Sequence, residues 1–512
     1  MWRYDATAIE NLSLQNLDGQ PDKLANRLAS LPADIESALD KLITRIRSGD
    51  NRINFSLTRP LFGARAPGRL DVMGGIADYS GSTVLQLPIQ ESTIVFCQHN
   101  DKPVFSVVSQ STDTDVAALE FCMPMSDFLD QGGTPHTDYQ MHQYFVEQAR
   151  EQQWAAYVAG VVTVLMQQFP CDVINDRGIL LYVSSTVPSG KGVSSSAALE
   201  VAVMRAICAL LQLDISAHQQ AVLCQRVENR IVGAPCGLMD QMASSCAEEG
   251  ALLNMLCQPD IINEPVSLPA GLSLWGIDSG LRHAVSGADY SSVRIAAFMG
   301  YRYILETAGI ADSNMAAADI NDYRWRGYLA NVSVSDYLQW FEKSLPERVS
   351  GREFLQRFDA TTDAITSVNP HVVYAVRACT AHPVHEHFRA RLFIQLAKTA
   401  QQVLDPEALA NLMGECMYQS HASYSSCGLD SHGTDDLVSR LKAIGSEGGI
   451  YGARITGGGS GGVVAVLARA DADDVIRAIA SDYAAASGIG GYVFSGSSSG
   501  AMVVCLMPSL ES

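Results

Sequence analysis

The amino-acid sequence predicts an α+β protein with two main domains, and three observations support this prediction. A chain of 512 residues is too long for a single hydrophobic core of ordinary size. From Arg59 onward, short β-rich runs alternate with helical segments, which is typical of mixed α and β architecture. The composition changes near Pro265–Gly271, ahead of a strand-like run. We therefore expect a helical extension over 1–58, a first domain over 59–270 and a second over 271–512.

Local patterns place the individual elements along the chain. Apolar residues recur at helical spacing between Pro32 and Gly49, so an amphipathic helix is expected over 32–48. Apolar or β-rich runs predict strands at 82–87, 93–97, 179–183, 272–277, 463–467 and 501–506. Longer segments predict helices at 154–168 and 197–211. The turn-rich segment Asp127–Thr137 is expected to be a surface loop.

The charge balance and the cysteines argue against several classes of function. Thirty-five basic and 55 acidic residues give a net charge of −20, which repels nucleic acids and anionic lipid surfaces. A phosphate-bearing ligand would therefore need a local positive device, such as an arginine, a metal ion or a helix N-terminus. The 12 cysteines form no CxxC pair and no signal peptide follows Met1, so a cytoplasmic location is expected. The most apolar stretch, Val158–Met166, is shorter than the ~20 residues of a membrane span.

Two glycine-rich loops are candidates for phosphate binding. The segment PSGKGVSSSAA, Pro188–Ala198, follows an apolar strand and opens a helix, so its backbone N–H groups are expected to face a ligand. Its spacing is not that of a Walker loop. A second loop, Ile455–Gly462, runs into an apolar strand. Each loop alone is also explained by an ordinary turn or helix start, but their occurrence together with RAPGRLDVMGGIADYSG, Arg65–Gly81, favours a phosphate-binding enzyme.

These three segments, in this order along the chain, resemble the three motifs of the GHMP kinase superfamily. Two further segments, ENRIVGAPCGLMDQ at 228–241 and LRHAVSGADY at 281–290, are similar to the galactokinase branch. The resemblance extends over roughly Phe62–Leu467. It implies a ribosomal-protein-S5-like N-terminal α/β domain, a ferredoxin-like C-terminal α+β domain and an active site between them. It also implies ATP and Mg²⁺ as cofactors and a small free sugar as substrate, with no nucleic-acid or membrane partner.

The resemblance implies a role for each matched residue. Asp240 would be the catalytic carboxylate with Arg69 beside it, and Ser196 and Glu228 would bind Mg²⁺. The plainer alternatives are a helix cap for Asp240 and a surface ion pair for Arg69. Positions matching the sugar site are Asp78, Gly75, Ile76, Gly237 and Tyr290. Positions matching the ATP site are Pro188, Ser189, Gly190, Lys191, Gly192, Val193, Ser194, Ser195, Ser196, Ala197, Gly458 and Gly459, of which Lys191 would either pair with a phosphate or be solvated.

The first motif departs from galactokinases at two positions. Those enzymes carry Glu-His where this chain has Gly75 and Ile76, and the resemblance implies that the missing Glu would contact the sugar 6-hydroxyl. L-Arabinopyranose is D-galactopyranose without the exocyclic CH₂OH, and a carboxylate facing a missing hydroxyl would be a costly buried charge. The sequence therefore predicts an L-arabinose 1-kinase. A carboxylate restored at Gly75 is then expected to favour galactose.

Longer stretches of sequence agree with a kinase for L-arabinose. The segments at 68–81, 275–285, 328–333 and 421–438 resemble the kinase part of the L-arabinokinase family. Plant members also carry a long N-terminal half similar to a glycosyltransferase, so this chain is expected to represent the kinase part alone. A galactokinase is the alternative within the same class, and a sensor that binds ATP and sugar without turnover is the alternative outside it. The oligomeric state, monomer or homodimer, stays open.

Two further features have simpler explanations than chemistry. His382, His385 and His387 in HPVHEH would suit a transition metal, but no cysteine or acidic pair stands at zinc-like spacing. Cys236, four residues before Asp240, is expected to be a packed thiol near the site.

Overall fold

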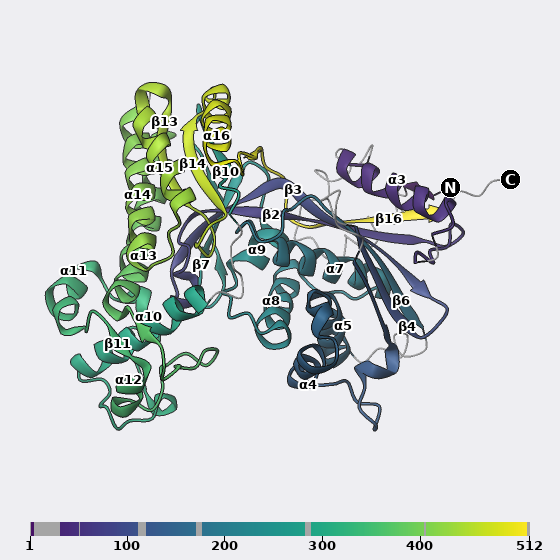
Figure 1. The fold of residues 1–512 in the computed structure, drawn as a ribbon, viewed down its shortest axis with the longest axis horizontal. Coiled ribbons are helices and arrows are strands. Elements are labelled where there is room, and N and C mark those ends of the chain that lie inside the picture. Colours follow the sequence, from purple (N-terminus) through teal and green to yellow (C-terminus); the bar gives the residue numbers. More distant parts are fainter. Residues whose placement is uncertain are drawn as a thin grey trace.

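The computed structural model describes residues 2–4, 31–50, 52–110, 119–169, 177–281, 288–403 and 406–508. In this part of the chain, two β-sheets lie next to each other and both are covered by helices (Figure 1). The interior of the motif at 281–290 falls outside the described residues. None of the described helices is long and apolar enough to cross a membrane.

The larger sheet contains ten of the described strands. They are β1 (Trp2–Tyr4), β2 (Leu61–Met73), β3 (Thr83–Asn100), β4 (Val104–Gln110), β5 (Leu119–Pro124), β6 (Gly178–Ser185), β7 (Ala251–Leu256), β8 (Ile261–Ile262), β9 (Val266–Ser267) and β16 (Met502–Pro508). The main path runs β1–β16–β2–β3–β6–β4–β5, and β7 pairs with β3, β8 and β9. The pairs are antiparallel except for β4 with β6. The long β2 thus runs through the centre of the molecule and carries both Arg69 and Asp71.

Most of the described helices pack on one of the two sheets. They are α3 (Ala33–Arg47), α4 (Asp138–Gln143), α5 (Ala156–Gln168), α7 (Ser195–Leu211), α8 (Ala217–Val227), α9 (Met239–Cys246), α10 (Ala288–Thr307), α11 (Val334–Asp336), α12 (Gly351–Arg357), α13 (Val376–Ala400), α14 (Glu407–Ser426), α15 (His432–Ile444) and α16 (Asp473–Ser487). On the larger sheet, Val95 and Leu181 face the core with α5 and α7, whereas Phe96 and Leu180 face the core with α3. This alternation is the period of two expected of strands buried on both faces.

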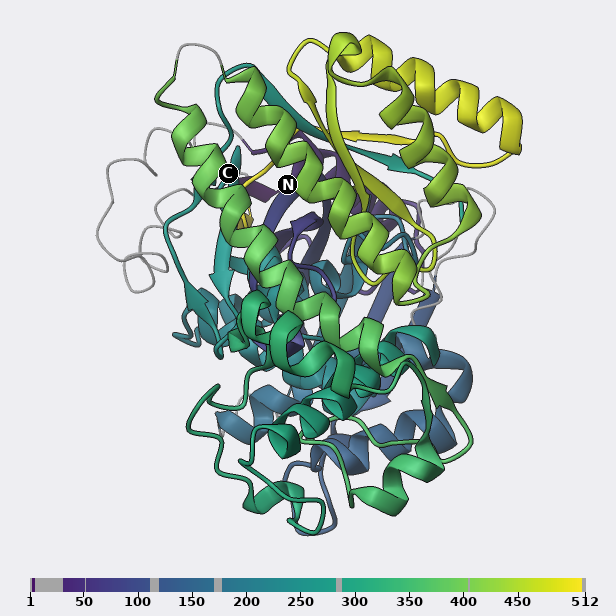
Figure 2. The ribbon, with the colours of Figure 1, turned by 90° about the vertical axis from the view of Figure 1, so that its left-hand side faces the viewer.

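The second sheet is antiparallel and has the order β13–β14–β10–β15, with β10 (Leu272–Asp278), β13 (Ile450–Ile455), β14 (Val463–Arg469) and β15 (Val493–Ser495). Along β14, Val464 and Val466 share a core with α15 and α16, whereas Val463 and Ala465 share one with α13 and α14. The latter core also contains Leu70 of β2, so it joins the two sheets. Figure 2 shows α13 and α14 running side by side across this second half. A two-stranded ribbon of β11 (Val349–Ser350) and β12 (Val373–Tyr374) completes the described strands.

The observed elements confirm the mixed α and β class and many local predictions. The helix expected over 32–48 is α3. The segment expected to be a loop at Asp127–Thr137 begins in a short 3-10 helix, Met125–Phe128, and continues as a loop closed by an isolated bridge between Leu129 and Pro135. The strands expected at 82–87 and 93–97 are parts of the single strand β3. The last strand, β16, pairs with β2 in the larger sheet, although it follows position 271 by a long stretch of chain. The domain boundary at 270 stays a prediction. Although β16 follows this position in the sequence, it belongs to the larger sheet and not to the four-stranded sheet formed after residue 271.

Candidate active site

A cavity between the two sheets brings together residues that are far apart in the sequence. It is lined by predicted site residues from the first half and by Tyr290 and Gly458 from the second. The predicted residues in its lining are Arg69, Asp78, Gly190, Gly192, Ser194, Ser195, Ser196, Glu228, Gly237, Asp240, Tyr290 and Gly458. The fold thus assembles candidates for the carboxylate, the phosphate loop and the sugar contacts around one space.

The two glycine loops contact each other at one side of this cavity. Gly190 and Gly192 have φ values of 70° and 71°, a region that favours glycine. A Cβ on Gly457 of the second loop would overlap the carbonyl oxygen of Gly192, so this close approach also requires glycine. Helix α7 begins at Ser195, which lines the cavity, so its first N–H groups open there. A helix N-terminus beside two glycine loops is a suitable site for phosphate oxygens.

Arg69 and Asp240 form an ion pair at the cavity. Arg69 Nε and Nη2 donate to the same oxygen, Asp240 Oδ1, at 3.0 and 2.7 Å, while Nη1 donates to the carbonyl of Gly192 at 2.7 Å. The Arg69 side chain is 3% exposed and that of Asp240 is 22% exposed. Asp240 is therefore held from behind by a buried cation and stays accessible from the cavity. Arg69 also links this carboxylate to the phosphate loop.

Glu228 lies deeper, in a cluster of buried acidic groups. It begins a single π-helical turn after α8, a distortion that is frequent at functional sites. Gln241 Nε2 donates to Glu228 Oε2 at 2.6 Å and to Glu200 Oε2 at 3.3 Å. Burial and the charge of Asp240 raise the pKa of Glu228 to about 7, and burial and the charge of Glu228 raise the pKa of Glu200 well above its usual range.

This acidic cluster is short of positive charge, which suits a cation. Glu200 Oε1 is buried with no hydrogen-bond partner in the part of the chain that the structure describes. Ser196 adds a hydroxyl that hydrogen-bonds Glu228. No group of three His, Cys, Asp or Glu among the described residues is arranged to hold a metal ion. Glu228 and Ser196 fit the one or two protein ligands that Mg²⁺ usually takes when phosphates and water complete its coordination shell.

Asp78 occupies a tightly packed corner of the cavity. Its Oδ1 is buried without a hydrogen-bond partner among the described residues, and a Cβ on Gly237 would overlap its Oδ2. Burial, followed by the charge of Asp240, raises the pKa of Asp78 to about 7. Tyr290 also lines this corner. The Asp78 carboxyl group also accepts a backbone hydrogen bond from Tyr79, so only one of its oxygens lacks a partner. A buried oxygen without a partner is a good acceptor for a ligand hydroxyl, because it has lost its water without gaining another donor.

Gly75 and Ile76 do not line the cavity. Ile76 is 1% exposed, has a φ of 48° and packs in a core with Tyr424. A Cβ on Gly75 would overlap Asp71 Oδ2 and the Tyr424 hydroxyl. A side chain at position 75 would therefore start towards a buried polar network rather than towards the cavity. The structure thus offers no room for the simple exchange of Gly75 for Glu that the sequence suggested.

The other predicted residues are placed around the cavity rather than in its lining. They are Pro188, Ser189, Lys191, Val193, Ala197 and Gly459. Lys191 pairs with Asp278 at 3.0 Å, an arrangement that neither sequence-based alternative anticipated. Cys236 does line the cavity and its thiol donates to Glu228 Oε2 at 3.5 Å. Among the three clustered histidines, His382 hydrogen-bonds the Gly75 carbonyl and His387 accepts from the Thr83 N–H.

Sequence reasoning missed two residues that support the site. Arg294 of α10 is paired with Asp363 and donates from Nη1 to the Pro235 carbonyl at 3.0 Å, which supports the loop next to Gly237. Glu200 lies beside the acidic cluster. Each stands four positions after a predicted site residue on the same helix, Tyr290 and Ser196 respectively. Residues four apart share a helix face, so this spacing was the available signal.

Comparison with known families agrees with this geometry. Residues 156–248 match the GHMP kinases N terminal domain, and residues 404–485 match the GHMP kinases C terminal domain. Residues 54–99 match the galactokinase galactose-binding signature. The chain belongs to the GHMP kinase superfamily. Within this superfamily, the N-terminal match contains the phosphate loop, Glu228 and Asp240, and the signature contains Arg69 and Asp78.

Individual relatives of this chain include an L-arabinokinase and galactokinases. It is 41% identical to the L-arabinokinase of Arabidopsis thaliana over 93% of this chain, and spans 49% of that protein. It is 28% identical to the galactokinase of Chloroflexus aggregans over 83% of this chain and 88% of that one. Its fold matches a solved Lactococcus lactis galactokinase complexed with galactose, with a TM-score of 0.61 and 20% identity, over 86% of this chain and 95% of that one. The chain therefore spans about half the length of the L-arabinokinase that it matches.

Proposed function

We propose that this GHMP kinase transfers the γ-phosphoryl group of ATP to the anomeric hydroxyl of L-arabinose, giving L-arabinose 1-phosphate and ADP. The observation that carries the proposal is the position of Asp240, held by Arg69 at a cavity that is also lined by the phosphate loop and Asp78. A phosphoryl acceptor and a phosphoryl donor bound there would meet beside one carboxylate. Catalysis would consist mainly of positioning and charge stabilisation.

Asp240 has the role of proton acceptor in this proposal. Arg69 engages only Oδ1, so Oδ2 is available to the sugar hydroxyl that attacks the γ-phosphorus. As the new O–P bond forms, the hydroxyl proton passes to Asp240, and the bond from the γ-phosphorus to the β-phosphate oxygen breaks to release ADP. Arg69 holds the Asp240 carboxylate in place and adds positive charge beside the phosphate loop.

The two loops and the acidic cluster have complementary roles. Backbone N–H groups at the start of α7 and in the second glycine loop would bind phosphate oxygens. Ser196 and Glu228 would hold Mg²⁺, which supplies further positive charge to the phosphates when bound. Asp78 and Tyr290 would accept and orient the sugar hydroxyls.

L-Arabinose is proposed as the acceptor on the basis of the arabinokinase relative. A galactokinase is the second candidate, because residues 54–99 match the galactose-binding signature. A coupled ADP-release assay across a panel of free pentoses and hexoses tests both. We expect ADP release that depends on L-arabinose. Release without any added sugar, or with none of the panel, would contradict a sugar kinase.

Glu228→Gln is expected to raise the Mg²⁺ concentration needed for half-maximal rate by about tenfold or more, since a neutral amide is a weaker ligand than a carboxylate. The measurement is a Mg²⁺ titration of the rate at saturating ATP, accompanied by direct titration of Mn²⁺ binding in the presence of ADP. Glu248→Gln, at an exposed position outside the cavity, is the matched control. An unchanged titration for Glu228→Gln would remove this residue from the metal site.

A further inference from the structure

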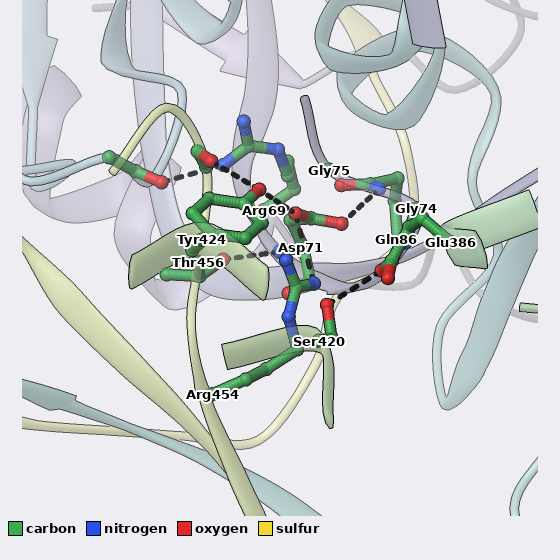
Figure 3. A network of polar contacts seen from close by, with 12 residues as sticks. Arg69, Asp71, Gly74, Gly75, Gln86, Glu386, Ser420, Tyr424, Arg454 and Thr456 are labelled. Carbon is green, nitrogen blue, oxygen red and sulfur yellow. Dashed lines mark hydrogen bonds and ion pairs between the residues drawn. The ribbon is translucent and has the colours of Figure 1, made fainter. Parts of the chain in front are cut away.

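A buried polar network lies behind the cavity, where the two halves of the molecule meet (Figure 3). Asp71 and Arg454, 383 positions apart, are both 0% exposed and form an ion pair at 3.1 Å. The Arg454 Nη1 also donates to the backbone carbonyl of Asp71, and Gln86 Nε2 donates to Asp71 Oδ1 at 2.8 Å. Fully buried ion pairs gain little net stability over apolar packing, so their presence beside an active site points to a positioning role.

On the sugar side, this network holds the turn that leads to Asp78. Glu386 Oε1 accepts from the Gly74 N–H at 2.9 Å and from the Ser420 hydroxyl at 2.7 Å. His382 lies 2.9 Å from the Gly75 carbonyl, and burial lowers its pKa to about 4, so its neutral ring donates to that carbonyl. Asp71 and the Tyr424 hydroxyl fill the space where a Cβ at Gly75 would stand. The turn is therefore held by hydrogen bonds at the Gly74 N–H and the Gly75 carbonyl, and by packing of Asp71 and Tyr424 against the Gly75 Cα.

On the nucleotide side, the same residues hold the start of the second glycine loop. The Tyr424 hydroxyl donates to the Gly457 carbonyl at 2.9 Å, and it lies 3.5 Å from Asp71 Oδ2. The backbone N–H of Asp71 donates to Thr456 Oγ1 at 2.6 Å. Gly457 in turn abuts Gly192 of the phosphate loop. The buried Tyr424 hydroxyl thus lies between the Asp71 carboxylate, next to the turn on the sugar side, and the second glycine loop on the nucleotide side.

We propose that Asp71, Tyr424 and Thr456 are positioning residues that couple sugar binding to nucleotide binding. The inference rests on the proposed function, because it takes the turn before Asp78 as the sugar side and the glycine loops as the nucleotide side. A ligand that orders one loop also orders the other, since their shared hydrogen bonds are buried and have no water to replace them. Each ligand therefore tightens the binding of the other by the same factor.

The test is the dissociation constant of L-arabinose, measured by calorimetry with and without Mg²⁺–ADP. In the unmodified protein we expect nucleotide to tighten sugar binding by about fivefold or more, within the usual range of coupling between sites. Tyr424→Phe, which keeps the ring and removes the hydroxyl, is expected to reduce this factor to about twofold or less. Thr456→Val, of the same shape without the acceptor oxygen, is expected to reduce it as well and serves if Tyr424→Phe does not fold.

Tyr337→Phe is the matched control. Tyr337 is equally buried in the same apolar core, and its hydroxyl also donates to a backbone carbonyl, that of Arg377 at 3.3 Å, but it contacts neither loop. We expect it to keep the coupling factor of the unmodified protein. Unchanged coupling in both Tyr424→Phe and Thr456→Val, or an equal loss of coupling in Tyr337→Phe, would overturn this inference and leave the proposed function standing. No sugar binding by the unmodified protein would instead contradict the proposed function.

Discussion

Asp240→Asn is expected to lower kcat by about 10²–10⁴ while ATP binding stays within a few-fold of the unmodified protein. The amide keeps the shape of the side chain and an oxygen for Arg69, but it does not take up the proton of the sugar hydroxyl. The phosphate loop contacts Arg69 through the Gly192 carbonyl, which the substitution leaves in place. Initial rates at saturating sugar, together with nucleotide titration by calorimetry, separate the two effects.

The control for this variant is Asp138→Asn. Asp138 is also paired with an arginine, Arg226, whose Nε and Nη2 donate at 2.8 Å, but it lies outside the cavity. Its loss is expected to affect stability and leave kcat nearly unchanged. A kcat for Asp240→Asn that equals that of the unmodified protein would remove Asp240 from its proposed role. An equal loss of ATP binding would assign it to ligand binding instead.

Gly75→Glu is expected to impair folding and to reduce activity on every sugar. The new Cβ would overlap Asp71 Oδ2 and the Tyr424 hydroxyl, and neither atom is free to move, because Arg454 holds the first and the Gly457 carbonyl holds the second. Overpacking a core typically costs ~1–3 kcal/mol, and an added carboxylate beside Asp71 brings like-charge repulsion in a buried region. Thermal unfolding and kcat/KM on L-arabinose and D-galactose measure the effect.

This expectation differs from the one drawn from sequence, in which Gly75→Glu mainly shifts preference towards galactose. The two are separable by experiment. A stable variant whose galactose-to-arabinose ratio of kcat/KM rises by about tenfold would favour the sequence-based expectation, since ~1.4 kcal/mol corresponds to one decade. A destabilised variant with both activities reduced would favour the packing argument. Gly132→Glu, in an exposed loop, is the control for the substitution itself. It is expected to cost much less stability than Gly75→Glu, because its Cβ would meet only the exposed Asp130 Oδ1, at 3.2 Å.

Local pattern was sufficient to predict much of the fold. The helix α3 and the strand β6 follow from apolar spacing that their burial reproduces, Ile35 and Leu42 being buried on one face of α3. The sequence did not predict that the strands expected at 82–87 and 93–97 form the single strand β3, because Pro88 and the polar residues 90–93 interrupt the apolar pattern between them. This strand pairs with β7 near its start and with β6 near its end. The pairing of β16 with β2 is a long-range choice that no local pattern encodes.

The site was predictable where its chemistry requires particular residue types. Glycines at 190 and 192 and the serines at the start of α7 suit phosphate oxygens, and the motif order linked them to Arg69 and Asp240, which line the same cavity. The position of Gly75 was not predictable in the same way. It depends on Tyr424, which lies far along the chain and reaches Gly75 only through the fold. The environment of Lys191 was not predictable either, because its partner Asp278 is distant in the sequence.

The comparison of kcat/KM for L-arabinose and D-galactose in the unmodified protein tests the proposed function most directly. Neither Gly75 nor Ile76 lines the cavity, so neither supplies a polar group that would recognise a 6-hydroxyl. We expect discrimination against galactose to rest on the shape of the cavity, which typically yields about 10–200-fold. We therefore expect L-arabinose to be the better substrate by a factor in this range, with galactose detectable and poor. Equal activity, or a preference for galactose, would contradict an L-arabinose 1-kinase.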